Sequence, residues 1–223
     1  MGVDIADFNN DSYLDYIQVD MDAKDNRRSK ANMASMNPDL FWSTVNYGFH
    51  YQYMHNTLQL NRRIQGDKPF FSNISRLSGI SSTDWSWGPL LADLDNDGWK
   101  DLFISNGIRR EINHRDFFND IKLRPMSNDS LLYYTEQMPS EAIANFTFQN
   151  NSDLTFTDVT KSWGLDQKNF SNGATYADLD NDGDLELIVN NIDQEAQIYR
   201  NNSTNNFINC LLYTSDAADE VLG

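Results

Sequence analysis

Three aspartate-rich segments recur along the chain at an almost constant spacing, and this pattern constrains the fold more than any other feature. The segments read ADFNNDSYLD, ADLDNDGWKD and ADLDNDGDLE, and they align without gaps. Their first aspartates are Asp7, Asp93 and Asp178, which are 86 and 85 residues apart. Self-similarity at a fixed period is the signature of a repeat architecture, so the chain is predicted to be an array of similar units.

Short apolar runs follow each aspartate segment, at residues 16–19, 102–104 and 187–189. Runs of this kind that begin at a turn predict β-strands. Further matching pieces lie between the segments, at residues 58–61 and 146–150. Each unit is therefore predicted to be a set of short strands joined by turns, which is the pattern of a propeller blade. The fold is predicted to be all-β.

The repeat is longer than a blade of short strands needs, and the additional residues fall in two segments. Residues 21–55 and 108–143 lack the alternation of polar and apolar residues that a strand shows. Partial apolar stripes at helical spacing occur in the second of these segments. Both are predicted to be partly helical inserts on one face of the array.

The aspartate segments carry oxygen-bearing side chains at the spacing of a cation-binding loop. Ca²⁺ takes about six to eight oxygen ligands from carboxylates, amides, backbone carbonyls and water. Side chains at loop positions 1, 3 and 5 turn towards one point, and a carbonyl at position 7 and an acid at position 9 complete the shell. Up to three Ca²⁺ sites are predicted. Their ligands are Asp7, Asn9, Asp11, the Tyr13 carbonyl and Asp15; Asp93, Asp95, Asp97, the Trp99 carbonyl and Asp101; and Asp178, Asp180, Asp182, the Asp184 carbonyl and Glu186.

An ordinary turn is the main alternative, because Asp, Asn and Gly favour turns without any metal. Three copies at a constant period favour a shared ligand instead. Clustered carboxylates also repel one another unless a cation neutralises them. Gly98 and Gly183 at position 6 permit a sharp reversal of the backbone, whereas Ser12 in the first loop predicts a more strained or weaker site.

Two other kinds of cation site fit the pattern less well. An EF-hand needs a glutamate at position 12 and helices on both sides. Position 12 is Gln18, Ile104 and Val189 in the three loops, and strands are predicted to follow. Magnesium prefers to keep several waters rather than an all-protein cage. Calcium in a hairpin loop closed at position 9 is therefore the preferred interpretation.

The chain carries 33 acidic and 17 basic residues, a net charge of −16. This balance argues against nucleic acid as a partner, because phosphate backbones are met by clustered Lys and Arg. No apolar run approaches the roughly 18 residues of a membrane span. The single cysteine, Cys210, excludes an internal disulfide framework and a cysteine-based zinc site.

Both ends of the sequence are expected to be artificial. No signal peptide precedes the first aspartate segment, and Met1 is expected to be an internal start. Residues 210–223 resemble the translated read-through of a sequencing adapter, so they are predicted to be a non-native tail. The chain is then expected to be truncated at both ends.

Residues 92–107 and 156–165, together with 51–61 and 83–88, resemble a known family, the FG-GAP or VCBS repeats. These repeats form the β-propeller of integrin α-subunits and of bacterial surface proteins, including relatives of cartilage acidic protein. The resemblance implies calcium in the hairpin between the first two strands of each blade. It also implies that residues 1–209 form a β-propeller fragment of about two and a half blades.

No catalytic constellation is visible, and the three histidines are isolated and predicted to have structural or surface roles. We expect a non-enzymatic, calcium-stabilised segment of a secreted, cell-surface or periplasmic protein that binds a protein or a glycan. One alternative is part of a polysaccharide-degrading enzyme, which would use acids of the inserts such as Asp116, Asp120 and Glu136. The other alternative is a purely structural spacer.

Overall fold

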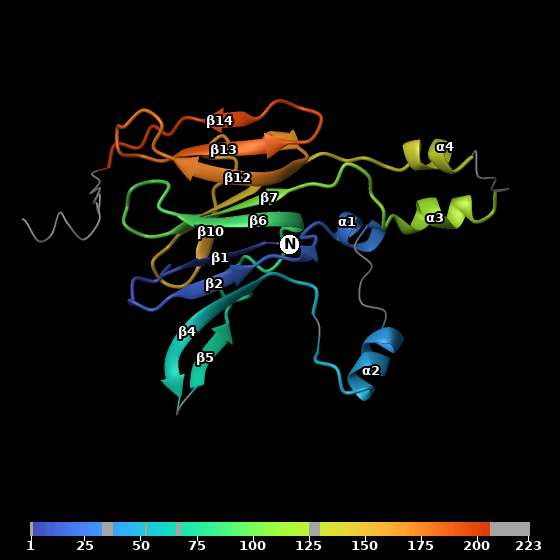
Figure 1. The fold of residues 1–223 in the computed structure, drawn as a ribbon, viewed down its shortest axis with the longest axis horizontal. Coiled ribbons are helices and arrows are strands. Elements are labelled where there is room, and N and C mark those ends of the chain that lie inside the picture. The colour runs from blue at the N-terminus through green and yellow to red at the C-terminus, as the bar shows by residue number, and fades with distance from the viewer. Residues whose placement is uncertain (1, 33–37, 52, 66–67, 125–129, 206–223) are drawn as a thin grey trace, which may run out of the picture.

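The computed structural model describes residues 2–32, 38–51, 53–65, 68–124 and 130–205 (Figure 1). Within these residues the chain is mainly β, and all its paired strands run antiparallel. The prediction of a mainly β fold is therefore confirmed. The tail predicted to be non-native lies outside the described residues.

The first sheet has the strand order β1-β2-β4-β5. β1 (Val3–Ala6) and β2 (Asp15–Gln18) form the hairpin that carries the first aspartate loop. β4 (Thr57–Gln65) pairs with β2, and β5 (Lys68–Asn73) forms the outer edge. Ile17 on β2 is completely buried, as expected for an antiparallel strand with one face on a core.

The second sheet has the strand order β10-β9-β7-β6-β3. β6 (Asp84–Ala92) and β7 (Asp101–Asn106) form the hairpin of the second aspartate loop. β9 (Phe146–Asn150) and β10 (Phe156–Asp158) follow on one side. β3 (Met21–Asp22) pairs with β6 on the other side, so the first two residues of the predicted first insert belong to a sheet.

The third sheet has the strand order β12-β13-β14. β12 (Ser171–Ala177) and β13 (Glu186–Asn191) form the hairpin of the third aspartate loop, and β14 (Gln197–Tyr199) pairs with β13. A separate ladder joins β8 (Ile143–Ala144) to β11 (Lys168–Asn169). Each of the three larger sheets thus contains one hairpin that carries an aspartate loop.

The helices of the described chain all lie within the two segments predicted to be partly helical inserts. The first segment contains α1 (Asn26–Ala31) and α2 (Pro38–Asn46), and the second contains α3 (Arg115–Ile121) and α4 (Ser130–Glu136). Figure 1 shows all four at the same end of the sheets, on the right of the view. In the described residues, no helix combines the length and the apolar character needed to cross a membrane.

Two clusters of buried side chains pack the sheets against one another. Ile17 of the first sheet lies in one cluster with Leu102 and Ile104 of β7. Phe103 of β7 lies in the other cluster with Val189 of the third sheet. Successive residues of a strand point to opposite faces, so β7 contributes to both clusters. The second sheet is therefore packed on both faces, with each fully buried side chain worth about 1.5–3 kcal/mol.

Arg28 on α1 ties both inserts to the second sheet. Its guanidinium donates to both carboxylate oxygens of Asp84, at 2.6 and 2.9 Å, and to Glu111 at 2.8 Å. A further hydrogen bond reaches Glu141 at 3.0 Å. Burial by itself disfavours the charged guanidinium, but the hydrogen bonds and negative charges of Asp84 and Glu111 outweigh it. Together they hold the pKa of Arg28 above its usual range.

Candidate metal centres

The three aspartate loops lie together at one end of the sheets, opposite the helices (Figure 1). They connect β1 to β2, β6 to β7 and β12 to β13. In each hairpin the alanine before the first aspartate pairs with the acid at position 9, as Ala92 does with Asp101. The strand register therefore brings position 9 back beside position 1 in all three loops.

Backbone N–H groups hold the carboxylates of the second loop in place. The N–H of Asp97 donates to Oδ1 of Asp93 at 3.0 Å, and the N–H of Gly98 donates to Oδ2 at 2.9 Å. The N–H of Trp99 donates to Oδ1 of Asp97 at 2.8 Å. The first loop has the same three bonds, at 3.1, 2.8 and 2.9 Å, and the third loop has two of them, both at 3.2 Å.

The acid at position 9 is the buried centre of each loop. Asp101 is fully buried, and it accepts the N–H of Leu94 at 3.1 Å and the N–H of Asn150 at 3.0 Å. Glu186 accepts two equivalent bonds, and Asp15 accepts one from the third strand of its sheet. This acid therefore fastens the loop to the neighbouring strand.

An asparagine in or just after the strand that pairs with each aspartate-loop hairpin completes the loop, and sequence reasoning gave it no role. These residues are Asn61, Asn150 and Asn201. Each donates its backbone N–H to the position-9 acid, at 2.7, 3.0 and 3.4 Å. Each also donates its side-chain amide to the carbonyl at position 8, at 3.0, 3.0 and 3.2 Å. The signal was present, because the matching strand segments LQLN, FTFQN and IYRN all end in asparagine.

The second loop brings three carboxylates close enough to share one cation. Asp93, Asp95 and Asp101 each offer one oxygen, and these oxygens lie within 4.8 Å of one another. Asp97 is not part of this group, and its Oδ1 accepts the backbone N–H of Trp99. In the described part of the first loop, where position 3 is Asn9, no comparable group of three acids forms.

The third loop assembles the largest acidic group. One oxygen each from Asp180, Asp182, Asp184 and Glu186 lies within 4.8 Å of the others. Asp184 joins this group through its carboxylate, whereas the sequence predicted its carbonyl as the ligand. Asp178 at position 1 is not part of the group. These two acidic groups, in the second and third loops, could each hold a metal ion.

Several carboxylate oxygens in the loops are buried without a hydrogen-bond partner among the described residues. They are Oδ2 of Asp15, Oδ1 of Asp178 and Oδ1 of Asp184. Asp15 is 0% exposed and Asp184 is 3% exposed. An ionised oxygen that is removed from water and left unpaired is costly. A cation would satisfy these oxygens, and an all-oxygen donor set suits a hard cation such as Ca²⁺.

Burial is the largest cause of a raised pKa for five loop acids, Asp15, Asp95, Asp101, Asp180 and Asp184. The pKa of Asp101 rises to about 7, first by burial and further by the charges of Asp95 and Asp97. Burial is also the largest cause that raises the pKa of Asp15 and of Asp184 to about 6. The backbone hydrogen bonds to Asp101 and Asp15 offset only part of this cost of burying the charged form, and a proton or a cation would offset the rest.

The backbone at position 6 is left-handed in all three loops. Its φ is 91° at Gly98, 92° at Gly183 and 70° at Ser12. A side chain makes this conformation costly by roughly 1–2 kcal/mol. Ser12 therefore carries backbone strain that glycine avoids in the other two loops.

The three acids that the enzyme alternative would use lie on the second insert, each in one of its helices. Asp116 is in the first turn of α3, where a negative charge is favourable, and Asp120 forms an ion pair with Arg124. Glu136 lies at the end of α4. His114 caps α3, because its Nδ1 accepts a backbone N–H at 3.3 Å. The structural role predicted for this histidine is confirmed.

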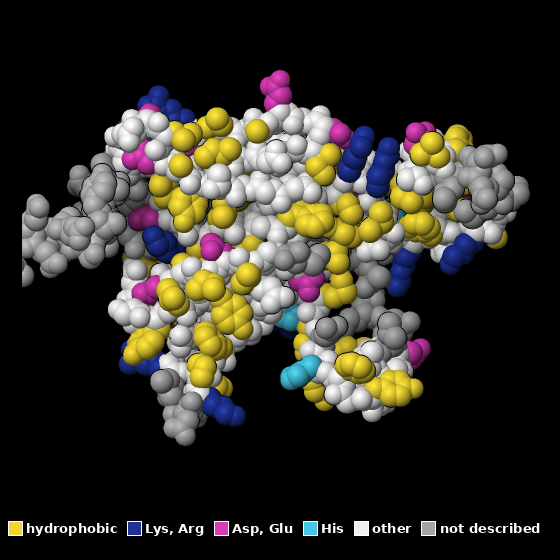
Figure 2. All heavy atoms as spheres, viewed as in Figure 1, with side chains coloured by type: hydrophobic (Ala, Val, Ile, Leu, Met, Phe, Trp, Pro, Cys, Tyr) yellow, Lys and Arg dark blue, Asp and Glu magenta, His cyan; other side chains and the backbone are white. Residues whose placement is uncertain are grey.

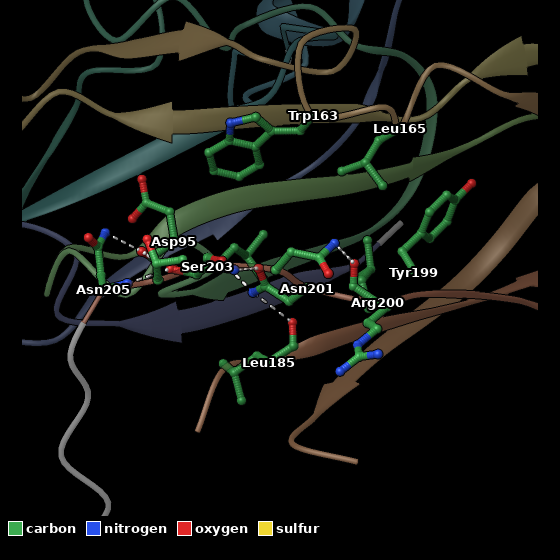
Figure 3. A pocket seen from close by; sticks show the side chains of 13 residues that line it. Asp95, Trp163, Leu165, Leu185, Tyr199, Arg200, Asn201, Ser203 and Asn205 are labelled. Atoms are coloured by element: carbon green, nitrogen blue, oxygen red, sulfur yellow. Dashed lines mark hydrogen bonds between the residues drawn. The ribbon is translucent and has the colours of Figure 1, made fainter. Parts of the chain in front are cut away.

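A cavity of about 350 Å³ lies beside the second and third loops (Figure 3). Its lining includes Asp95 and the aromatic side chains of Trp163 and Tyr199. The chain that leaves β14 passes along it, where Ser203 and Asn205 donate to the carbonyl of Asp95 at 2.8 and 2.7 Å. The third sheet is thereby attached to position 3 of the second loop.

Comparison of the chain with protein-family models and with curated protein sequences found no match. The chemistry of the loops therefore has to be argued from their own residues. Those residues form two oxygen-only acidic groups at one end of antiparallel sheets.

Proposed function

We propose that the chain is a calcium-binding segment of a β-propeller from a secreted, cell-surface or periplasmic protein. The observation that carries this proposal is the buried carboxylate oxygen of Asp184, which has no described partner and belongs to a group of four acids. Calcium accepts more oxygen ligands than magnesium. Loops that bind calcium with low affinity are typical of extracellular modules. Calorimetric titration with calcium tests the proposal, and the absence of binding heat together with the absence of bound metal would contradict it.

The way in which the sheets adjoin supports a propeller of about two and a half blades. The first and third sheets start with the hairpin that carries an aspartate loop, and further strands follow outward. In the second sheet β9 and β10 follow β7 in the same way, while β3 pairs with the other side of β6. Oδ2 of Asp4 on β1 accepts the N–H of Leu91 on β6 at 2.7 Å. The first strands of two successive aspartate-loop hairpins thus lie side by side, as the inner strands of neighbouring blades would.

The end with the helices is the proposed binding surface for a protein or a glycan. Trp42, Tyr47, Phe49 and Tyr51 are all more than half exposed. Figure 2 shows hydrophobic side chains gathered over the region of α2, at the lower right of the view. Exposed apolar patches on soluble domains mark interaction sites. The cation loops, at the opposite end, would then stabilise the sheets rather than contact the partner.

A cavity of about 400 Å³ near this end favours a glycan as the ligand. It is lined by Tyr53, His55, Asn73, Ser75 and Arg76. Ser75 is 1% exposed, and its hydroxyl has no hydrogen-bond partner among the described residues. The exposed ring of Tyr53 offers a face for stacking on a sugar, and the polar side chains offer donors and acceptors for its hydroxyls. Arg76 would favour a carboxylated sugar in this otherwise acidic chain.

A panel of neutral and carboxylated oligosaccharides tests this ligand. The intact chain is expected to bind a carboxylated member, and Tyr53→Ala or Arg76→Ala is expected to weaken binding by roughly tenfold, the equivalent of about 1.4 kcal/mol. Arg62→Ala is the matched control, because Arg62 is an exposed arginine on β4 that does not line the cavity. Equal losses in all three variants, or no binding by the intact chain, would refute the assignment.

A further inference from the structure

The asparagine at position 4 of one aspartate loop reaches the next loop along the array. Nδ2 of Asn10 in the first loop donates to the carbonyl of Gly98 in the second loop at 3.0 Å. Nδ2 of Asn96 in the second loop donates to the carbonyl of Gly183 in the third loop at 3.2 Å. The same pair of loop positions, 4 and 6, is joined in both cases. The three loops therefore form a hydrogen-bonded series.

The peptide unit that receives each bond also holds a loop carboxylate. The carbonyl of Gly98 and the N–H of Trp99 belong to one planar peptide unit, and that N–H donates to Oδ1 of Asp97 at 2.8 Å. In the third loop, the N–H that follows Gly183 likewise donates to Oδ1 of Asp182 at 3.2 Å. A hydrogen bond to the carbonyl of a peptide polarises its N–H. The position-4 amide of one loop thus strengthens the hydrogen bond that holds the position-5 carboxylate of the next loop.

A second bond joins the same pairs of loops. Nδ2 of Asn150 donates to the carbonyl of Phe8 in the first loop at 2.9 Å, while its N–H holds Asp101 in the second loop. Nδ2 of Asn201 donates to the carbonyl of Leu94 in the second loop at 2.6 Å. Figure 3 shows Asn201 between the strands, with its bond to the carbonyl of Leu185 in the third loop. Each pair of neighbouring loops is therefore joined twice.

The conformation at position 4 explains why asparagine occupies it. The φ angles of Asn10, Asn96 and Asn181 are 55°, 57° and 59°, in the left-handed region. Asparagine tolerates this region better than other residues with a side chain. Asn181 has the same backbone conformation, but its side chain donates to no other loop among the described residues. It therefore separates the effect of the backbone from the effect of the bond between loops.

We infer that cation binding at successive loops is cooperative, and that Asn10 and Asn96 are positioning residues that couple one site to the next. This inference rests on the proposed calcium-binding function. A cation that orders one loop fixes the amide that orients the peptide of the next loop, so the second cation meets a loop that is already partly ordered. Coupling of this kind typically changes the affinity of a neighbouring site by about 5-fold to 150-fold.

Calorimetric titration of the intact chain with calcium tests the coupling, using glycine replacements because glycine keeps the left-handed backbone. The unaltered chain is expected to give a sigmoidal isotherm. Asn96→Gly is expected to make the curve less steep and to weaken binding at one neighbouring loop by about 5-fold or more. Asn10→Gly is expected to act in the same way on the first pair of loops, so a folding failure of one variant leaves the other. Asn181→Gly is expected to leave the curve unchanged.

The outcomes separate this inference from the proposed function. If the unaltered chain binds no calcium, both fail. If it binds calcium with a curve that Asn10→Gly and Asn96→Gly leave unchanged, the coupling is overturned and the calcium-binding function stands. If Asn181→Gly alters the curve as strongly as Asn96→Gly, the effect comes from the backbone of the loop and the coupling is likewise overturned.

Discussion

Calcium is expected to raise the melting temperature of the metal-free chain by roughly 10 °C or more, as two sites held at 100 times their dissociation constants add about 5 kcal/mol. The reason is the set of buried, unpartnered carboxylate oxygens in the loops, including that of Asp184. Neighbouring carboxylates within a loop repel one another without a cation, and burial together with the charges of Asp95 and Asp97 raises the pKa of Asp101 to about 7. A thermal scan by circular dichroism, with calcium and then with EDTA, measures the change.

Two controls show whether this stabilisation comes from the loops. Magnesium at the same concentration is expected to give a smaller rise, because it keeps its waters. Replacing Asp180 and Asp182 by asparagine is expected to remove the contribution of the third loop while the second loop keeps its own. A melting temperature that calcium leaves unchanged, or that rises equally in this double variant, would contradict the loop sites.

Arg28→Met is expected to destabilise the chain by about 3–5 kcal/mol, because it leaves buried carboxylates without their partner. The side chains of Arg28, Asp84 and Glu111 are 6%, 6% and 3% exposed. Asp84 and Glu111 would each keep a negative charge in a site closed to water. Chemical unfolding followed by fluorescence measures the loss in the free energy of unfolding.

Arg27→Met is the matched control for this change. Arg27 is the neighbouring residue on the same helix and also binds Glu141, but its side chain is 64% exposed. An exposed ion pair contributes only about 0–1 kcal/mol. If both variants lose the same amount of stability, the buried network does not fix the inserts as described.

The local parts of this structure could be predicted from the sequence. The period of the aspartate segments located the three hairpins, because each hairpin is formed by residues close together in the chain. The spacing of the acids within each segment predicted which carboxylates lie in the loops. Within the loops, the spacing did not predict that Asp97 lies outside the second acidic group or that the carboxylate of Asp184 joins the third, because both depend on the direction of the side chain.

The contacts between distant segments could not be predicted in the same way. Asn150 and Phe8 are 142 residues apart, and Arg28 and Glu111 are 83 residues apart. An isolated asparagine or arginine in a single sequence does not indicate which distant residue it will contact. The recurrence of asparagine at position 4 of all three loops was visible, but the reach from Asn10 to Gly98 appears only when the sheets are placed side by side.

The number of calcium ions bound to the metal-free chain at saturation tests the central claim most directly. Equilibrium dialysis with measurement of total calcium is expected to give at least two ions, one in each of the second and third loops, whose acids form groups that could hold a metal ion. The first loop is expected to fill last, because Ser12 strains its backbone and Asn9 replaces an acid. A chain that retains no calcium at millimolar concentration would contradict the claim that these loops are cation sites.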